Sequence, residues 1–196
     1  MITSEFGLYN LQHIPAPAGI EELHNGMNEV VLPEILPGSR SKLIKTDGCG
    51  KIAEFKTTLT GEMIWALSQE TILRDAIDLT QSENDKEYLI KGYEYCVENG
   101  LNEALFKTRI LKNIFRLSRQ SVYSFFIGAI LQAEIHEIVK AKENKVIIAG
   151  KKQIKTAMVS LLNRLCDKKV TGVSDETAEF ASAFGAVKIY EYKNNI

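Results

Sequence analysis

Residues 52–73 read IAEFKTTLTGEMIWALSQETIL, and a change of period within this stretch decides the fold. Before Gly61, polar and apolar residues alternate, as they do along a half-buried β-strand. After Gly61, apolar residues recur at a spacing of about 3.6, which places them on one face of a helix. The stretch therefore predicts a strand that leads directly into a helix from Glu62 to about Asp75.

The strand in this stretch is the second half of a predicted β-hairpin. The segments SKLIKT (41–46) and KIAEFKTTLT (51–60) both alternate. Between them, Gly48 and Gly50 supply the positive φ angles of a tight turn. A β-rich run upstream, EVVLPEILPG at 29–38, predicts one more strand before the hairpin.

Apolar spacing predicts more helices after this unit. Thr80 with Glu83 three residues later resembles a capping box, and Gly100 suits the C-terminal end of the helix that this box would open. The expected helices cover 83–99, 102–115 and 118–142.

Strands and helices alternate in the last third of the chain. The expected elements are a strand at 146–149, a helix at about 154–165, a strand at 170–173 and a helix from Asp175. Such alternation implies parallel pairing and an α/β fold. The order β-β-β-α-β-α-β-α is that of the ribonuclease-H-like lobe of actin-like ATPases. We therefore expect an irregular N-terminal arm at 1–28, the lobe at 29–196 and a helical insertion in it at about 80–142.

The composition limits the classes of function. The 196 residues include 24 basic and 25 acidic side chains, so the net charge of -1 creates no global field that would attract nucleic acid or a membrane. Cys49, Cys96 and Cys166 have no CxxC spacing, and their odd number argues against a disulfide framework. There is no leader pattern, and no stretch approaches the roughly 18 apolar residues of a membrane span. We expect a soluble, cytoplasmic protein without nucleic-acid or membrane partners.

Several known site patterns are absent or out of context. Gly48, Gly50 and Ala53 match GxGxxA, but here the pattern joins two strands, whereas a dinucleotide-binding turn joins a strand to a helix. The sequence has no P-loop, no HExxH and no metal-spaced set of cysteines and histidines. We therefore predict no metal ligands and name no catalytic residue.

The first of three candidate anion sites is PGSRSK at 37–42. It follows a strand and offers free backbone N–H groups, two hydroxyls and two cations, as other anion-binding turns do. An ordinary Pro-Gly-Ser turn is the alternative. The candidate phosphate-binding residues are Gly38, Ser39, Arg40, Ser41 and Lys42.

The other two candidate sites are strand-to-helix junctions. At TTLTGE (57–62), the helix macrodipole favours an anion, and simple capping is the alternative. IAGKK (148–152) lies where ligands collect in parallel sheets. The alternative there is a loop glycine beside a solvated face of Lys151, Lys152 and Lys155. The candidate ligand-binding residues are Thr58, Thr60, Gly61 and Glu62 at the first junction, and Gly150 and Lys151 at the second.

Taken in order, these stretches resemble the 2-dehydro-3-deoxygalactonokinase family of sugar-acid kinases, in the actin-like ATPase superfamily. The resemblance is carried by MITSEFGL and APAG near the start, PGSRSK, IAEFKTTLTGEMIWALSQETIL, YSFFIGAILQAEI, VIIAG and DETAEFASAFGA. The segment around residues 55–73 is the most specific. Its F-x-T-x-[ML]-T-G-E, an apolar helix and S-x-x-x-I-L read like a signature of that family.

The resemblance implies a reaction and roles for the three sites. ATP, with Mg, would phosphorylate 2-dehydro-3-deoxy-D-galactonate in galactonate degradation. Residues 37–42 would form the second phosphate-binding hairpin, and 60–62 would lie toward the cleft. Gly150 and Lys151 would form the adenosine-binding turn.

The departures from the family bear on activity. PGSRSKL replaces the family's PGTHSKW, and Lys151 and Lys152 replace small residues of the adenosine turn. The family's opening Asp-Trp-Gly-Thr strand and an acidic segment resembling D-V-M-R-G-E-E-T-Q have no counterpart here. We therefore expect an N-terminally truncated member, inactive or incomplete alone, with a separate N-terminal lobe or a homodimer as partner. The alternative is a non-catalytic protein whose lobe binds a nucleotide or a partner.

Overall fold

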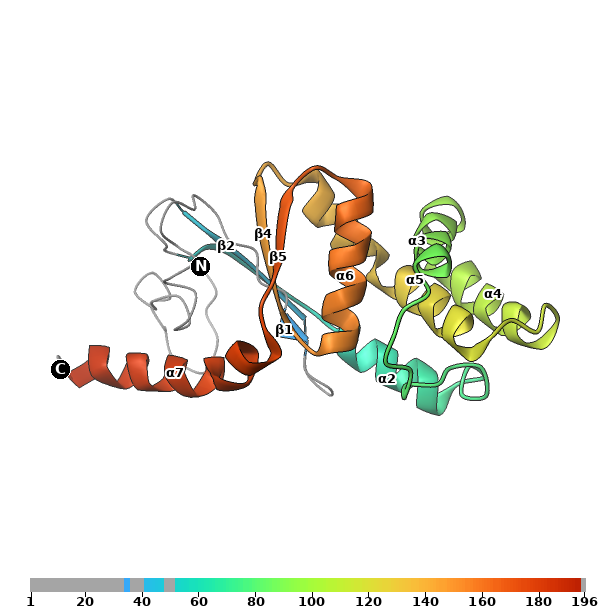
Figure 1. Cartoon of the computed structure of the whole chain (residues 1–196), viewed down its shortest axis with the longest axis horizontal. Coiled ribbons are helices and arrows are strands. Elements are labelled where there is room, and N and C mark those ends of the chain that lie inside the picture. Colours follow the sequence, from blue (N-terminus) through green and yellow to red (C-terminus); the bar gives the residue numbers. More distant parts are fainter. Residues whose placement is uncertain (1–33, 36–40, 48–51, 195–196) are drawn as a thin grey trace, which may run out of the picture.

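The computed structural model describes residues 34–35, 41–47 and 52–194, and the predicted arm at 1–28 lies outside them (Figure 1). The chain follows the expected order of strands and helices. The elements are β1 (Glu34–Ile35), β2 (Ser41–Thr46), β3 (Ile52–Thr58), α2 (Thr60–Glu70), α3 (Lys86–Asn99), α4 (Leu101–Asn113), α5 (Arg119–Lys140), β4 (Lys145–Gly150), α6 (Lys152–Leu165), β5 (Lys169–Gly172) and α7 (Asp175–Asn194).

The strands form two ladders. Strands β2 and β3 pair antiparallel from Ser41↔Thr58 onward, which confirms the predicted hairpin, and its turn glycines lie outside the described residues. Strands β1, β4 and β5 pair parallel in that order, with Ile35 opposite Gly150. The mixed α/β class is confirmed. Among the described residues no ladder joins β1 to β2, so the five-stranded ribonuclease-H-like arrangement stays a prediction.

The change of period after the hairpin produces the helix α2, with boundaries that differ from the prediction. The helix begins at Thr60 and ends at Glu70, where Thr71 becomes extended. The hydroxyl of Thr71 donates to the carbonyl of Leu67 and accepts from the N–H of Leu73, which closes the helix in a turn. The apolar residues that suggested a longer helix therefore belong to this turn, and Leu73 is buried there.

The predicted capping box at Thr80 and Glu83 is wrong. The helix α3 begins at Lys86, and the carboxylate of Asp85 accepts hydrogen bonds from the N–H groups of Glu87 and Tyr88. The hydroxyl of Thr80 instead donates to Asp78, at 2.6 Å. The threonine that was predicted to cap the helix is therefore bonded to a carboxylate two residues before it, in a local turn. The end of this helix was predicted correctly, because Gly100 has a φ of 82°.

Helix α5 is the core of the molecule. It begins after Ser118, close to the predicted start, and the hydroxyl of Ser118 caps it. By length and composition this helix could cross a membrane, with a mean hydropathy of 1.3 in its most apolar window, so the expectation that no stretch approaches such apolarity was wrong. However, 72% of that window is buried inside the protein. The apolarity reflects packing against α2, α3, α4 and α6 (Figure 1).

Two glycines allow α3 and α5 to approach at backbone contact. A Cβ atom on Gly92 of α3 would overlap the carbonyl of Phe125, and one on Gly128 of α5 would overlap the carbonyl of Leu89. Both obstacles are backbone atoms, which cannot rotate away as a side chain can. This contact is reinforced at the start of α3, where Asp85 accepts from the hydroxyl of Ser121 on α5 at 2.8 Å.

We expect Gly92→Ala and Gly128→Ala each to lower the free energy of unfolding, measured by urea denaturation. Overpacking of this kind costs about 1–3 kcal/mol or more, and here it outweighs the gain in helix propensity. Gly185→Ala is the matched control, since a Cβ at this position in α7 meets nothing within 4 Å. It should raise stability by roughly 0.5–1 kcal/mol. Equal effects at all three glycines would contradict the close contact.

The turn at Asp78 generates a prediction about pH. Hydrogen bonds from the hydroxyl and N–H of Thr80, then from Gln81 and Arg119, lower the pKa of Asp78 from 3.8 to about 2. Because the pKa is lower in the folded state, the contribution of Asp78 to stability is present above about pH 4 and is lost as the pH falls through about 2. NMR titration of the side-chain carboxyl should give this low pKa. Asp78→Asn should remove that part of the pH dependence of unfolding.

Candidate functional site

Two of the three predicted sites meet at a glutamate that we did not predict. Glu134 lies on α5 and is only 4% exposed. Its carboxylate accepts hydrogen bonds from Ser41 at 3.3 Å, from Thr58 and from Thr60 at 2.5 Å. Ser41 begins β2, Thr58 ends β3 and Thr60 begins α2. Glu134 lies in YSFFIGAILQAEI, but there it was one polar residue on an apolar helix, and no local pattern indicated its partners.

The hydrogen bonds of this cluster determine which groups can meet a ligand. A hydroxyl has one proton to donate. The hydroxyls of Ser41, Thr58 and Thr60 direct theirs to Glu134. The oxygens of Thr58 and Thr60 are also 3.1 Å apart, and a bond between them would use the same protons. These hydroxyls therefore have no proton left for a phosphate.

The capping alternative for TTLTGE is wrong. Helix α2 has Leu59 as its N-cap, and a leucine side chain cannot accept a hydrogen bond. Helix α6 has Lys151 in the same position, and lysine is only a donor. By contrast, α3 and α5 are capped by Asp85 and Ser118. The N-cap residues of α2 and α6 therefore supply no side-chain acceptor to the first-turn N–H groups of these helices, and an anion is one acceptor that such groups can bind.

The third predicted site lies at the same edge of the structure as the other two. Gly150 ends β4 opposite Ile35, and Ser41 pairs with Thr58, so the short connection 36–40 joins the two places. Strand β1 also contacts β2. Figure 1 shows α2 and α6 both beginning at this lower edge of the strands. Gly150 has a φ of 124°, so the backbone itself demands glycine there.

The remaining predicted residues divide into three groups. Lys42 is half-buried, while Glu62 and Lys151 are exposed at the edge. Gly61 is buried in the first turn of α2. The predicted residues Gly38, Ser39 and Arg40 lie outside the described residues.

The alternative reading of residues 148–152, in which Lys151, Lys152 and Lys155 form a solvated face, is wrong for Lys155. This side chain is 8% exposed, and its Nζ donates to the carbonyl of Val173 at 2.6 Å and to the carboxylate of Asp175. The ion pair lowers the pKa of Asp175. Lys155 thus ties α6 to the start of α7. Of the three lysines in that alternative reading, only Lys151 and Lys152 are exposed.

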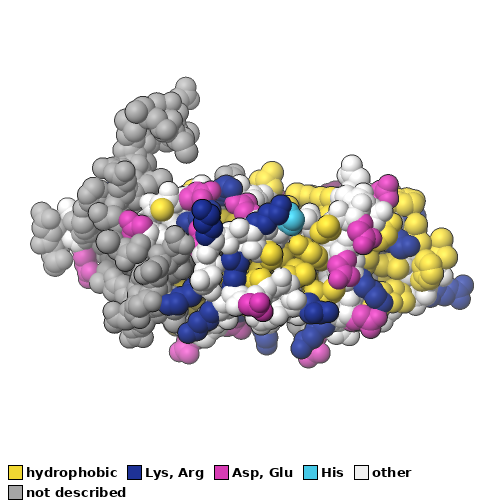
Figure 2. Space-filling model, turned by 90° about the horizontal axis from the view of Figure 1, so that it is seen from above, with side chains coloured by type: hydrophobic (Ala, Val, Ile, Leu, Met, Phe, Trp, Pro, Cys, Tyr) yellow, Lys and Arg dark blue, Asp and Glu magenta, His cyan; other side chains and the backbone are white. Residues whose placement is uncertain are grey.

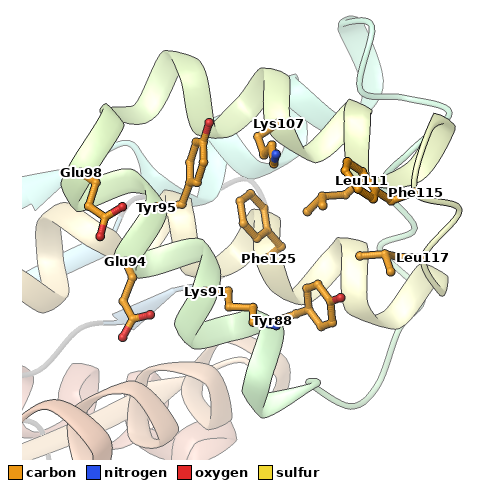
Figure 3. Close-up of a pocket in the computed structure, with 10 residues that line it drawn as sticks. All are labelled: Tyr88, Lys91, Glu94, Tyr95, Glu98, Lys107, Leu111, Phe115, Leu117 and Phe125. Atoms are coloured by element: carbon orange, nitrogen blue, oxygen red, sulfur yellow. The ribbon is translucent and has the colours of Figure 1, made fainter.

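Two cavities adjoin α3. One, of about 970 Å³, lies between α3 and α6 and is lined by residues that include Ile90, Lys155 and Thr156. Lys155 is the first residue of α6 in this lining, and it lies one helical turn after Lys151. The other, of about 400 Å³, lies within the helices α3, α4 and α5 (Figure 3). There the ammonium of Lys107 lies over the rings of Tyr95 and Phe115, and none of the predicted site residues lines it.

The described residues do not supply a protein site for Mg. No group of three histidine, cysteine, aspartate or glutamate side chains among them could hold a metal ion. Both carboxylate oxygens of Glu134 already accept hydroxyl protons. In nucleotide enzymes Mg is held largely by phosphate oxygens and water.

Comparison with known proteins places this geometry in a family. A model described as 2-keto-3-deoxy-galactonokinase matches residues 31–184. A solved structure from Sinorhizobium meliloti, of a protein assigned as a 2-dehydro-3-deoxygalactonokinase, has a TM-score of 0.69 at 19% identity over 87% of this chain and 55% of that one. This chain therefore spans about half the length of that protein.

A second solved structure is more distant. It is the activator of the 2-hydroxyisocaproyl-CoA dehydratase from Clostridium difficile with bound ADPNP. The TM-score is 0.48 at 13% identity, over 87% of this chain and 63% of that one. No curated protein matches the chain.

Proposed function

This chain belongs to the 2-keto-3-deoxy-galactonokinase family, and on that premise we propose that it supplies the ATP-binding lobe of a kinase for 2-dehydro-3-deoxy-D-galactonate. The sugar acid and the galactonate degradation route come from the family alone. The proposal includes a second lobe, on the same or another chain, that completes the cleft. Without it the chain would still bind nucleotide, but it would transfer phosphate weakly or not at all.

The convergence of the strand ends is the observation that carries this proposal. The start of β2, the end of β3 and the end of β4 lie together, and two helices begin beside them with uncapped N–H groups. Such N–H groups favour an anion because the helix macrodipole adds to their hydrogen bonds. Lys42 and Lys151 add positive charge at the same edge. This arrangement suits the phosphates of a nucleotide.

The roles of the residues follow from what each can donate. Backbone N–H groups of the turn at 37–42 and of the first turn of α2 would hold the phosphates, assisted by Lys42. Charge that develops on the transferred phosphoryl group is stabilised by such fixed donors. The adenosine end would lie past Gly150, toward the cavity between α3 and α6. Mg would reach the site bound to the nucleotide.

The second candidate function is binding of a protein partner without catalysis. Large apolar side chains are exposed on the helical part of the chain, and Figure 2 shows hydrophobic atoms gathered over that half of the visible face. On α3, on α4 and in the residues directly after α4, the most exposed of them are Val97, Phe106, Ile114 and Phe115. A surface of this kind is typical of a site for another protein or lobe. It is compatible with the first proposal, because a kinase lobe also needs its counterpart.

We expect ATP to bind to this chain, with a Kd measurable by calorimetry, and Lys42→Ala and Lys151→Ala each to weaken binding roughly fivefold. Each change removes a partly exposed cation, worth about 1 kcal/mol beside a phosphate. Lys169→Ala is the matched control. Lys169 is exposed at the start of β5, whereas the site lies where the parallel strands end. Absence of ATP binding, or equal weakening by all three changes, would contradict the proposal.

A further inference from the structure

We propose that Glu134 is the positioning residue of this site. Its carboxylate accepts hydrogen bonds from the hydroxyls of Ser41, Thr58 and Thr60, and it thereby holds two junctions, the start of β2 and the passage from β3 into α2, against α5. This inference rests on the proposed function for its link to nucleotide. It changes the chemistry that the sequence suggested, because phosphate would be met by backbone N–H groups and lysines and not by these hydroxyls.

Burial makes the three hydrogen bonds obligatory. A carboxylate that is 4% exposed must be satisfied by protein donors, since an unpaired buried charge is strongly destabilising. The hydroxyls provide three such donors, on both oxygens of Glu134. Ser41 is 0% exposed and Thr60 6%, so neither hydroxyl has free access to water in exchange. The buried groups of Ser41, Thr60 and Glu134 therefore depend on one another, and the partly exposed Thr58 supplies the third donor.

The contacts also span the chain. Glu134 is separated from Ser41 by 93 residues, from Thr58 by 76 and from Thr60 by 74. A local turn or a helix cap joins residues that are only a few positions apart in the sequence. Each bond crosses from the core helix to the edge where β2 starts and β3 passes into α2. The carboxylate thus sets where the start of α2 lies relative to the start of β2.

The negative charge of Glu134 would repel an anion bound nearby, and this repulsion helps to test the positioning role. If Glu134 acted on a phosphate only through its charge, neutralising it would strengthen anion binding. If it acts by positioning, neutralising it loosens both junctions and weakens binding in spite of the lost repulsion. The two roles therefore predict effects of opposite sign.

Glu134→Gln tests the role, with Glu137→Gln as the matched control. Glu137 lies one turn further on α5, and its carboxylate bonds the exposed Lys56. Both variants lose one negative charge from the same helix, but only the first loses one of the two oxygens that accept hydrogen bonds from the hydroxyl cluster. If Glu134→Ala does not fold, Glu134→Gln still tests the positioning role, because a glutamine side chain keeps the shape of glutamate and one acceptor oxygen.

Hydrogen exchange is the measurement that does not need a ligand. We expect at least tenfold faster exchange in Glu134→Gln for the β2 amides at Ser41–Leu43 and for Met63, whose N–H bonds the carbonyl of Leu59. Exchange at the same amides should stay unchanged in Glu137→Gln. Unchanged exchange in Glu134→Gln, or equal acceleration throughout the chain, would overturn the positioning role.

The affinity for ATP is the second measurement. We expect Glu134→Gln to weaken binding about fivefold or more, and Glu137→Gln to leave it equal or slightly stronger. Tighter binding in both variants would show a role through charge and overturn the proposal. If the unchanged protein binds no ATP, the proposed function fails, while the exchange result still decides whether Glu134 positions the two junctions.

Discussion

The burial of helix α5 is the constraint on which the rest of the structure depends. Gly92 and Gly128 bring α3 and α5 into backbone contact, and apolar side chains fill the other sides. Close-packed interiors transmit position because few voids are left to absorb a shift. The same helix carries Phe125 at the cavity of Figure 3 and Glu134 at the strand edge. The helical part and the candidate site are therefore placed relative to each other by one rigid element.

A buried polar group on such a helix dictates the chemistry around it. Because Glu134 is sealed from water, nearby hydroxyls must face inward, and the residue types that looked suited to phosphate are committed elsewhere. Among the described residues, the groups left at the surface of the site include backbone N–H, Lys42, Lys151 and the carboxylate of Glu62. This division is physically sensible, since fixed N–H groups at helix starts need no reorganisation when an anion arrives.

Electrostatic pairs tie the outer elements to this frame. Lys155 joins α6 to the start of α7, and Lys56 joins the hairpin to Glu137 on α5. Lys45 bonds Glu54 across the hairpin at 2.6 Å. Exposed pairs contribute little stability, so the buried contacts of Lys155 and Glu134 matter more. The edge that faces the proposed nucleotide is therefore held by contacts to α5.

The sequence by itself determined the hairpin, the order of elements, the end of α3 at Gly100, and the family resemblance. Periods of 2 and 3.6 and the φ preference of glycine are local properties, readable within a few residues. Only the tertiary structure decided that Asp85 and not Thr80 caps α3, that Lys155 is buried, and that Glu134 gathers Ser41, Thr58 and Thr60. The reason is physical: a hydrogen bond between residues 74 to 93 positions apart depends on how α5 packs, and no local pattern of side chains records that packing.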